Sequence, residues 1–298
     1  MTAAPDAPFG RVLTAMATAF REDGSLDLDG IARTATYLVD HGHDGIVVSG
    51  TTGESATTTI AEDGQIITAV KDAVGDRAQV IAGVGTNDTR HTLELARQAE
   101  KCGADGALLV TPYYNKPSPK GVIHHFRQVV DATDLPVMLY DVPGRTGTKL
   151  APAVFEELAG WEKVLAVKDA AADVTQAVRL RKLGFAVYSG DDALTLGFLA
   201  YGGCGVVSVL GHAAGDDLRT MIDAFLAGDL ATAQDVNARL QPALAAVMGV
   251  PNYGATTAKA SLQLLGVIDN RHVRSPLLAL DDEEYDALRA GLTASGLL

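Results

Sequence analysis

The chain has 298 residues, enough for one large domain or for an α/β barrel with a small appendage. It is 47% hydrophobic and 20% charged, a composition typical of a folded globular enzyme and not of a disordered or fibrous protein. Its formal net charge of −13 argues against binding to nucleic acid or to an anionic membrane surface. A small anionic substrate would therefore need local cations at its site.

Short β-branched runs alternate with longer amphipathic segments along most of the chain. The runs lack polar alternation, which is typical of parallel strands buried on both faces. The predicted strands cover residues 12–19, 45–49, 79–83, 107–111, 136–140, 164–168, 186–189 and 205–209. Apolar residues recur at helical spacing between them, for example at 28–41, 89–102 and 174–183. Eight such units predict an α/β fold, a closed (β/α)₈ (TIM) barrel.

Beyond about residue 228 the pattern becomes wholly helical, with helices expected at 230–248, 256–265 and 282–294. We therefore predict a barrel domain at 1–228 and a C-terminal helical appendage at 229–298, a candidate oligomer contact. The two cysteines have no metal-type spacing, and no signal peptide or long apolar run is recognisable. A cytoplasmic protein without a membrane-spanning segment is expected.

Polar segments follow five of the predicted strands, at the carboxyl ends where such barrels carry their active sites. These segments are GTTGES (50–55), TPYYNKP (111–117), YDVPGRTG (140–147), KDA (168–170) and SGDD (189–192). Lys168 ends a strand that should be buried, and burial lowers the pKa of an amine and frees it to attack a carbonyl. A structural lysine paired with Asp169 or with another barrel carboxylate is an equally weighted alternative on position alone.

Two further strand ends supply hydroxyl groups. Tyr140 is expected beside Lys168, and a relay through Tyr140, Thr51 and Tyr114 could move the protons of imine formation. Each tyrosine taken singly is more often an ordinary aromatic of the rim. Thr51 and Thr52 are flanked by glycines and offer hydroxyl and N–H groups to a carboxylate.

Arg145 lies in a Pro-Gly-Arg-Thr-Gly turn beside the same site. A guanidinium can hold a carboxylate through two parallel hydrogen bonds, which would imply a second acidic substrate. A surface arginine in a turn is the alternative of equal weight.

The ordered set GTTGES, TPYYNKP, YDVPGRTG, VKDA and SGDD resembles the dihydrodipicolinate synthase and N-acetylneuraminate lyase superfamily, most of all its dihydrodipicolinate synthase branch. The similarity runs from about Arg11 to Leu298. It implies a lyase of diaminopimelate and lysine biosynthesis that condenses pyruvate with L-aspartate 4-semialdehyde. It also implies a homotetramer built from tight dimers and a covalent lysine–pyruvate imine, without metal or organic cofactor.

The resemblance also implies a role for each matching residue. Lys168 forms the Schiff base, while Tyr140, Thr51 and Tyr114 relay protons, with Tyr114 lent by a neighbouring subunit. The implied binding groups are Thr52 for the pyruvate carboxylate, the backbone carbonyls of Gly190 and Val207, and Arg145 for the semialdehyde carboxylate.

Two departures from the family pattern concern regulation and one loop. Relatives inhibited by lysine carry a histidine pair where this chain has Ile60 and Asp63, and a glutamate where it has His91. These departures leave feedback by lysine an open question, since four other positions still match that site: Ser55, Ala56, Asn87 and Tyr113. The loop YDVPGRTG replaces the commoner YNVPSRTG, which puts Asp141 in place of asparagine.

Two alternatives to this function stay open. Lyases of the superfamily that act on sialic acid, 2-keto-3-deoxy sugar acids or 4-hydroxy-2-oxoglutarate would share Lys168 and Tyr140 and differ in the second pocket. A catalytically silent barrel that only binds keto acids is the alternative of a different class.

Overall fold

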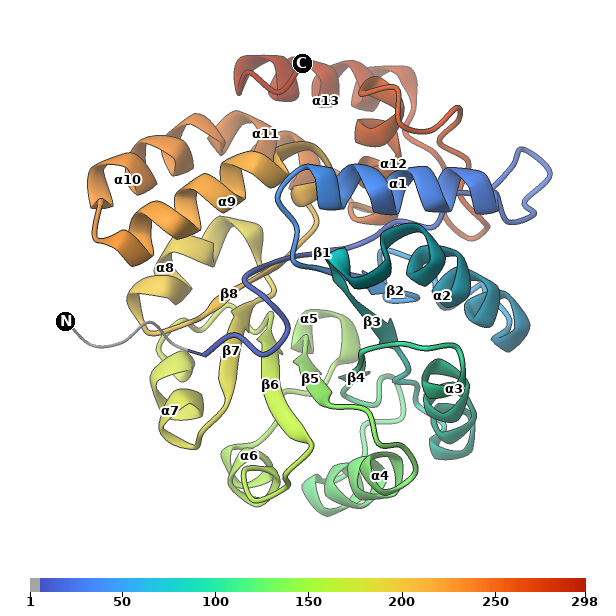
Figure 1. The fold of residues 1–298 in the computed structure, drawn as a ribbon, viewed down its shortest axis with the longest axis vertical. Helices are drawn as coiled ribbons and strands as arrows, with labels where there is room; N and C mark the ends of the chain where they lie inside the picture. Colours follow the sequence, from blue (N-terminus) through green and yellow to red (C-terminus); the bar gives the residue numbers. More distant parts are fainter. Residues whose placement is uncertain (1–5) are drawn as a thin grey trace.

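The computed structural model describes residues 6–298. Eight parallel strands follow one another in sequence order and close into a barrel, which confirms the predicted fold class (Figure 1). The strands are β1 (Val12–Ala15), β2 (Gly45–Val48), β3 (Gln79–Gly83), β4 (Gly106–Val110), β5 (Val137–Asp141), β6 (Val164–Asp169), β7 (Ala186–Ser189) and β8 (Gly205–Ser208). The first strand ends earlier than predicted. The reason is local, because the Ala17 N–H bonds to the His212 ring and not to a neighbouring strand.

The alternation of side chains along each strand sorts them between two cores. Met138 and Tyr140 of β5 point into the barrel, whereas Leu139 packs outward against the helices. In β6 the same alternation sends Ala166 inward and Val167 outward. Residues 140 and 168 are direct neighbours in the register of β5 and β6, so their side chains enter the same interior layer.

Helices surround the barrel and pack on the outward faces of the strands (Figure 1). Their bounds are α1 (Leu28–Asp40), α2 (Ile60–Val74), α3 (Thr89–Lys101), α4 (Pro119–Asp131), α5 (Pro143–Thr146), α6 (Pro152–Leu158), α7 (Gln176–Lys182), α8 (Thr195–Ala200) and α9 (Gly211–Ala227). Side-chain oxygens of Asp27, Thr59, Asp88 and Ser118 cap the first four of these helices. The predicted helices at 28–41, 89–102 and 174–183 are thus found with small shifts.

The C-terminal part is helical, as predicted, and contains α10 (Leu230–Arg239), α11 (Gln241–Met248), α12 (Ala255–Leu264) and α13 (Asp282–Ala294). The expectation of one continuous helix over 230–248 is wrong. Pro242 has no N–H for the carbonyl of Ala238, and a new helix begins with this proline in its first turn.

These helices lie together on one side of the barrel, next to α9 (Figure 1). Their apolar residues form one core with Val12 of β1 and Val206 of β8. The boundary at residue 228 stays a prediction. Within residues 6–298, no helix combines the length and the apolar character needed to cross a membrane.

Candidate active site

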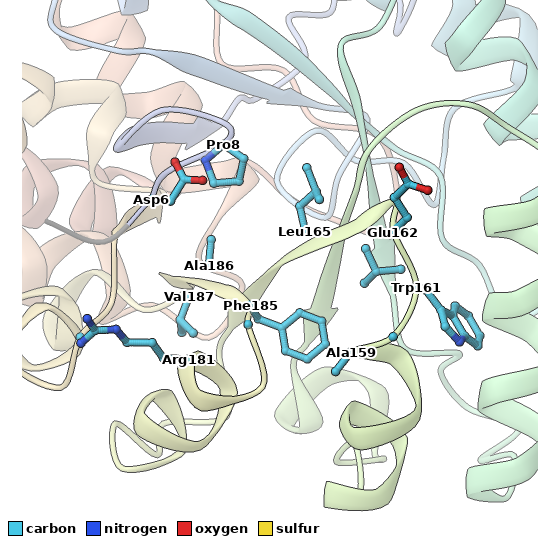
Figure 2. A pocket seen from close by; sticks show the side chains of 14 residues that line it. Asp6, Pro8, Ala159, Trp161, Glu162, Leu165, Arg181, Phe185, Ala186 and Val187 are labelled. Atoms are coloured by element: carbon cyan, nitrogen blue, oxygen red, sulfur yellow. The ribbon is translucent and has the colours of Figure 1, made fainter. Parts of the chain in front are cut away.

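Cavities open at opposite ends of the barrel, and their linings differ in chemistry. Figure 2 shows the cavity of about 600 Å³ at the amino-terminal ends of β6 and β7. Its charged side chains, Asp6, Glu162 and Arg181, stand apart around it and do not converge on one point. At the carboxyl end, a cavity of about 400 Å³ brings together six of the predicted site residues: Thr51, Thr52, Tyr140, Arg145, Lys168 and Gly190. The chemistry therefore belongs to the carboxyl end.

Lys168 reaches this cavity from the end of β6 and is 5% exposed. Its Nζ lies 4.3 Å from the centre of the Tyr140 ring. Burial lowers the pKa of Lys168 to about 8, with a smaller opposing effect of Asp192 and a smaller lowering effect of Arg145. At pH 8 roughly half of this amine is uncharged, against well under one percent of an ordinary lysine.

A second buried lysine shows what a structural lysine looks like in this fold. Lys259 of α12 is 1% exposed, and burial lowers its pKa to about 8 as well. Its Nζ lies 2.5 Å from Oε1 of Glu54 in an ion pair and also donates to the carbonyl of His272. Lys168 forms no ion pair with any residue of the described chain. The alternative of a structural pair with Asp169 is wrong, because that carboxylate points out of the barrel and binds Gln176.

Tyr140 is buried beside the lysine, and burial raises its pKa to about 12. Smaller effects oppose one another: Arg145 and a side-chain hydrogen bond with Thr51 lower this pKa, whereas Tyr253 raises it. The phenol therefore stays protonated at neutral pH and can donate a proton to a bound group. Arg145 comes from α5, a single helical turn that replaces the predicted plain turn.

The loop that carries Thr51 and Thr52 is fixed at its base by the buried carboxylate of Glu54. Glu54 has a left-handed backbone, with φ of 60°, and its N–H donates to the carbonyl of Thr51. Its carboxylate accepts from Lys259 and, at 2.8 Å, from the N–H of Arg274. The C-terminal segment thereby holds the threonine loop in place over the barrel.

Breaking this ion pair should cost both stability and pyruvate binding. Lys259→Met leaves the Glu54 carboxylate buried and uncompensated, so we expect the free energy of unfolding to fall by about 3–5 kcal/mol. Urea unfolding measures the loss. The double variant Glu54→Gln with Lys259→Met removes both charges and should recover a large part of it. Equal losses in the single and double variants would contradict the role given to the unpaired charge.

Two residues that follow β7 shape the wall behind Lys168. A side chain at Gly190 would come within about 3 Å of Lys168 Cγ and of Ala170, so only glycine permits this close approach. Asp192 lines the same cavity, and its carboxylate accepts from the Ser208 hydroxyl and from the N–H groups of Val209 and Leu210.

Val207, in contrast, belongs to the apolar interior layer, where it pairs with Leu13 of β1. Val209 forms the cavity wall on that strand. The carbonyl role implied for Val207 stays a prediction. Val209 follows the end of β8, two residues beyond Val207 and nearer the carboxyl end of the barrel.

Tyr114 does not reach the smaller cavity and is 87% exposed. Its backbone is left-handed, with φ of 71°, a conformation costly for a bulky side chain. The Tyr114 N–H bonds to the carbonyl of Thr146, so the loop after β4 rests on the loop of Arg145.

An adjoining cavity of about 820 Å³ shares Thr51, Tyr140 and Arg145 with the smaller one. It contains the positions that match the lysine site of inhibited relatives, namely Ser55, Ala56, Asn87 and Tyr113, together with the departures Asp63 and His91. Ile60 begins α2 and lies outside this lining. The cavity is therefore formed, but its chemistry differs at two positions.

A pair of buried carboxyl groups lies directly behind Tyr140 and Lys168. Asp141 and Asp169 are register neighbours and fully buried on the outer side of the barrel. Asp141 Oδ1 accepts from the Leu150 N–H, whereas Oδ2 has no hydrogen-bond partner among residues 6–298. Burial, with a smaller contribution from Asp169, raises the pKa of Asp141 to about 6, against small opposing effects of Lys149 and Gln176.

This pair predicts a pH-dependent stability. Because the folded-state pKa of Asp141 lies above its ordinary 3.8, its stabilising contribution is present below pH 4 and is lost as pH rises through about 6. The loss amounts to roughly 3 kcal/mol. Asp141→Asn should therefore unfold at higher temperature than the parent at pH 8 and show little gain at pH 4. Thermal unfolding between these values tests this, and a gain independent of pH would contradict it.

Sequence reasoning missed several residues of the cavity wall. Asp192 belongs to the SGDD segment, but the sequence did not predict that it lines the cavity. Met248, Asn252 and Tyr253 reach the cavity from the C-terminal part, where no motif marks them. The only available signal was the turn Pro251-Asn-Tyr-Gly254 between two predicted helices.

Fold and site together define a class of protein. A buried amine without an ion pair, beside a phenol and a hydroxyl at the carboxyl end of a (β/α)₈ barrel, is the arrangement of a class I aldolase-type enzyme, in which a lysine captures a carbonyl compound.

Comparison with known proteins agrees with this class. Residues 8–295 match the Dihydrodipicolinate synthetase family. The 4-hydroxy-tetrahydrodipicolinate synthase of Kineococcus radiotolerans is 52% identical over 99% of this chain and 96% of its own. That of Acidothermus cellulolyticus is 54% identical over 97% of this chain and 94% of its own. The chain belongs to the dihydrodipicolinate synthetase family and is an enzyme of the lyase class.

Solved structures of the same family superimpose closely. Dihydrodipicolinate synthase of Bacillus anthracis has a TM-score of 0.92 and 39% identity, with 96% of this chain and 98% of that chain covered. The enzyme from Cyanidioschyzon merolae with lysine bound has a TM-score of 0.93 and 40% identity, with 97% and 99% covered.

Proposed function

We propose that this chain is a 4-hydroxy-tetrahydrodipicolinate synthase, which condenses pyruvate with L-aspartate 4-semialdehyde in diaminopimelate and lysine biosynthesis. The observation that carries the proposal is the Lys168 amine, buried in a polar cavity, free of an ion pair within the described chain and with its pKa lowered to about 8. Relatives about half identical over nearly the whole chain bear the name of this synthase.

The proposed reaction begins with attack of the Lys168 amine on the keto carbon of pyruvate. Water leaves, an imine forms, and loss of a proton from the methyl carbon gives an enamine. The enamine carbon then attacks the aldehyde carbon of the semialdehyde, which forms the new carbon–carbon bond. The amino group of the semialdehyde next attacks the imine carbon, closes the ring and releases Lys168. The protonated imine is the electron sink, so the scheme requires no metal or organic cofactor.

Tyr140 and Thr51 supply the proton transfers of these steps in our proposal. The phenol of Tyr140 is protonated at neutral pH and lies next to the Lys168 Nζ, so it can donate to the leaving hydroxyl of the carbinolamine. Its hydrogen bond with Thr51 offers the path by which a proton returns. Thr52, buried in the cavity wall, is the proposed ligand of the pyruvate carboxylate.

Arg145 is proposed to select the second substrate. It lines the cavity, its field lowers the pKa values of both Lys168 and Tyr140, and among residues 6–298 no carboxylate pairs with it. A guanidinium in this position can hold the carboxylate of the semialdehyde through two hydrogen bonds. The sugar-acid lyases of the superfamily would need groups for several hydroxyls at the same place.

We further propose that the chain works as a homotetramer and that Tyr114 completes the proton relay of a neighbouring copy. The exposure of this aromatic ring on a left-handed backbone supports the proposal, because strain of this kind is retained where a partner or a function requires it. Lysine feedback stays an open question, and the cytoplasmic location stays a prediction.

Substrate requirement tests the proposed function. The purified protein should consume pyruvate only when L-aspartate 4-semialdehyde is also present, and each substrate alone should give no product. Cleavage of N-acetylneuraminate, 2-keto-3-deoxy sugar acids or 4-hydroxy-2-oxoglutarate at a comparable rate would contradict the assignment. Arg145→Ala should raise the KM for the semialdehyde while leaving imine formation with pyruvate intact.

A further inference from the structure

The Arg145 guanidinium lies near the aromatic ring of Tyr253. Its Cζ lies 5.1 Å from the centre of that ring, and both side chains line the cavity of Lys168. In the part of the chain that the structure describes, no acidic side chain forms an ion pair with Arg145. Among residues 6–298, this ring is the one side chain with which the Arg145 guanidinium forms an ion pair, a hydrogen bond or a cation–π contact.

Tyr253 belongs to a turn that the surrounding structure holds in place. It lies between α11 and α12, and its N–H donates to the carbonyl of Val250. The neighbouring Asn252 donates from Nδ2 to the carbonyl of Leu278 at 3.0 Å and accepts from the Thr256 hydroxyl at 2.8 Å. These bonds connect the turn to the segment before α13 and to α12, so the ring stands on a supported backbone.

The geometry of the contact matters for binding. A cation–π contact of this length leaves the N–H groups of the guanidinium free to bind a carboxylate in a bidentate manner. Removing the ring would remove the one cation–π contact of the Arg145 guanidinium among residues 6–298. Tyr253 and Tyr140 line the same cavity.

We propose that Tyr253 is a positioning residue for the second substrate: its ring orients the Arg145 guanidinium and thereby sets the affinity for the carboxylate of a short aldehyde acid. This inference rests on the proposed function, in which Arg145 binds that carboxylate. It assigns a substrate-selecting role to the C-terminal helical part.

Two variants separate the ring from the hydroxyl. Tyr253→Phe keeps the aromatic face, whereas Tyr253→Leu keeps an apolar side chain without it. We expect the leucine variant to raise the KM for L-aspartate 4-semialdehyde about 5- to 10-fold, with kcat and the KM for pyruvate within about twofold of the parent. The phenylalanine variant should match the parent in all three. Borohydride trapping of pyruvate on Lys168 should be equally fast in both, which also shows that they are folded.

A double-mutant cycle tests whether Tyr253 acts through Arg145. In an Arg145→Ala background, Tyr253→Leu should have no further effect on the semialdehyde KM. A leucine variant with an unchanged KM, equal damage by phenylalanine and leucine, or full additivity with Arg145→Ala would each overturn the proposal. Failure of the parent protein to form any pyruvate adduct would instead refute the proposed function, and this inference with it.

Discussion

Lys168→Ala is expected to lower kcat/KM by at least about four orders of magnitude, because covalent catalysis has no substitute once the amine is gone. The other buried lysine among residues 6–298, Lys259, is paired with Glu54 and does not line the cavity. A steady-state assay with both substrates, coupled to a reductase that consumes the product, measures the loss.

The fold should survive this replacement. A buried amine without an ion pair is costly to desolvate, so Lys168→Met, which keeps most of the volume, is expected to unfold at the same or a higher temperature than the parent. Inactivity together with a retained melting temperature separates a chemical loss from unfolding. Retention of more than about a hundredth of the parent activity by Lys168→Ala would contradict the account.

Tyr140→Phe has the second largest expected effect, a fall in kcat of roughly 10²- to 10³-fold. The Tyr140 ring lies beside the Lys168 amine, and the variant removes only the phenol oxygen. The rate of borohydride-trapped adduct formation with pyruvate alone should fall in parallel, because protons are needed already for imine formation. Quenching the reaction with borohydride at successive times and quantifying the adduct measures that rate.

The chain offers a matched control for Tyr140. Tyr188 is also a buried tyrosine of the barrel interior, on β7, but its hydroxyl accepts from the N–H of Phe9 and does not line the cavity. Tyr188→Phe should lose stability of about 1–3 kcal/mol while its folded fraction keeps kcat within a few-fold. Similar losses of kcat in the two variants would show that Tyr140 has only a structural role.

Much of the fold could be predicted because the signals are local. Runs such as Val164-Leu-Ala-Val167 are apolar without alternation, and only a parallel strand covered on both faces accounts for them. The predicted first strand is too long because residues 16–19 continue the same pattern, whereas Ala17 bonds to His212 and Thr18 to the loop after β2. The helix at 230–248 was broken by Pro242, a local signal that was present in the sequence.

The residues of the site likewise divide into those that local sequence signals predict and those that they do not. Lys168 and Tyr140 could be predicted because each ends a recognisable strand, and parallel strands in a barrel bring their ends together. The contact of Tyr253 with Arg145 and the Glu54–Lys259 ion pair could not be predicted. Each joins segments about 100 to 200 residues apart, and no sequence pattern in one segment indicates contact with the other. The acidic pair of Asp141 and Asp169 depends on strand register, which the strand boundaries alone do not fix.

The central claim is that one amine, that of Lys168, forms the covalent bond with the keto acid. The most direct test is to reduce the protein with borohydride in the presence of pyruvate and to locate the adduct by peptide mass spectrometry. We predict the mass of one reduced pyruvate on the peptide that contains Lys168, and none on the peptide that contains Lys259. An adduct on Lys259, or no adduct under conditions where the enzyme turns over, would contradict the account.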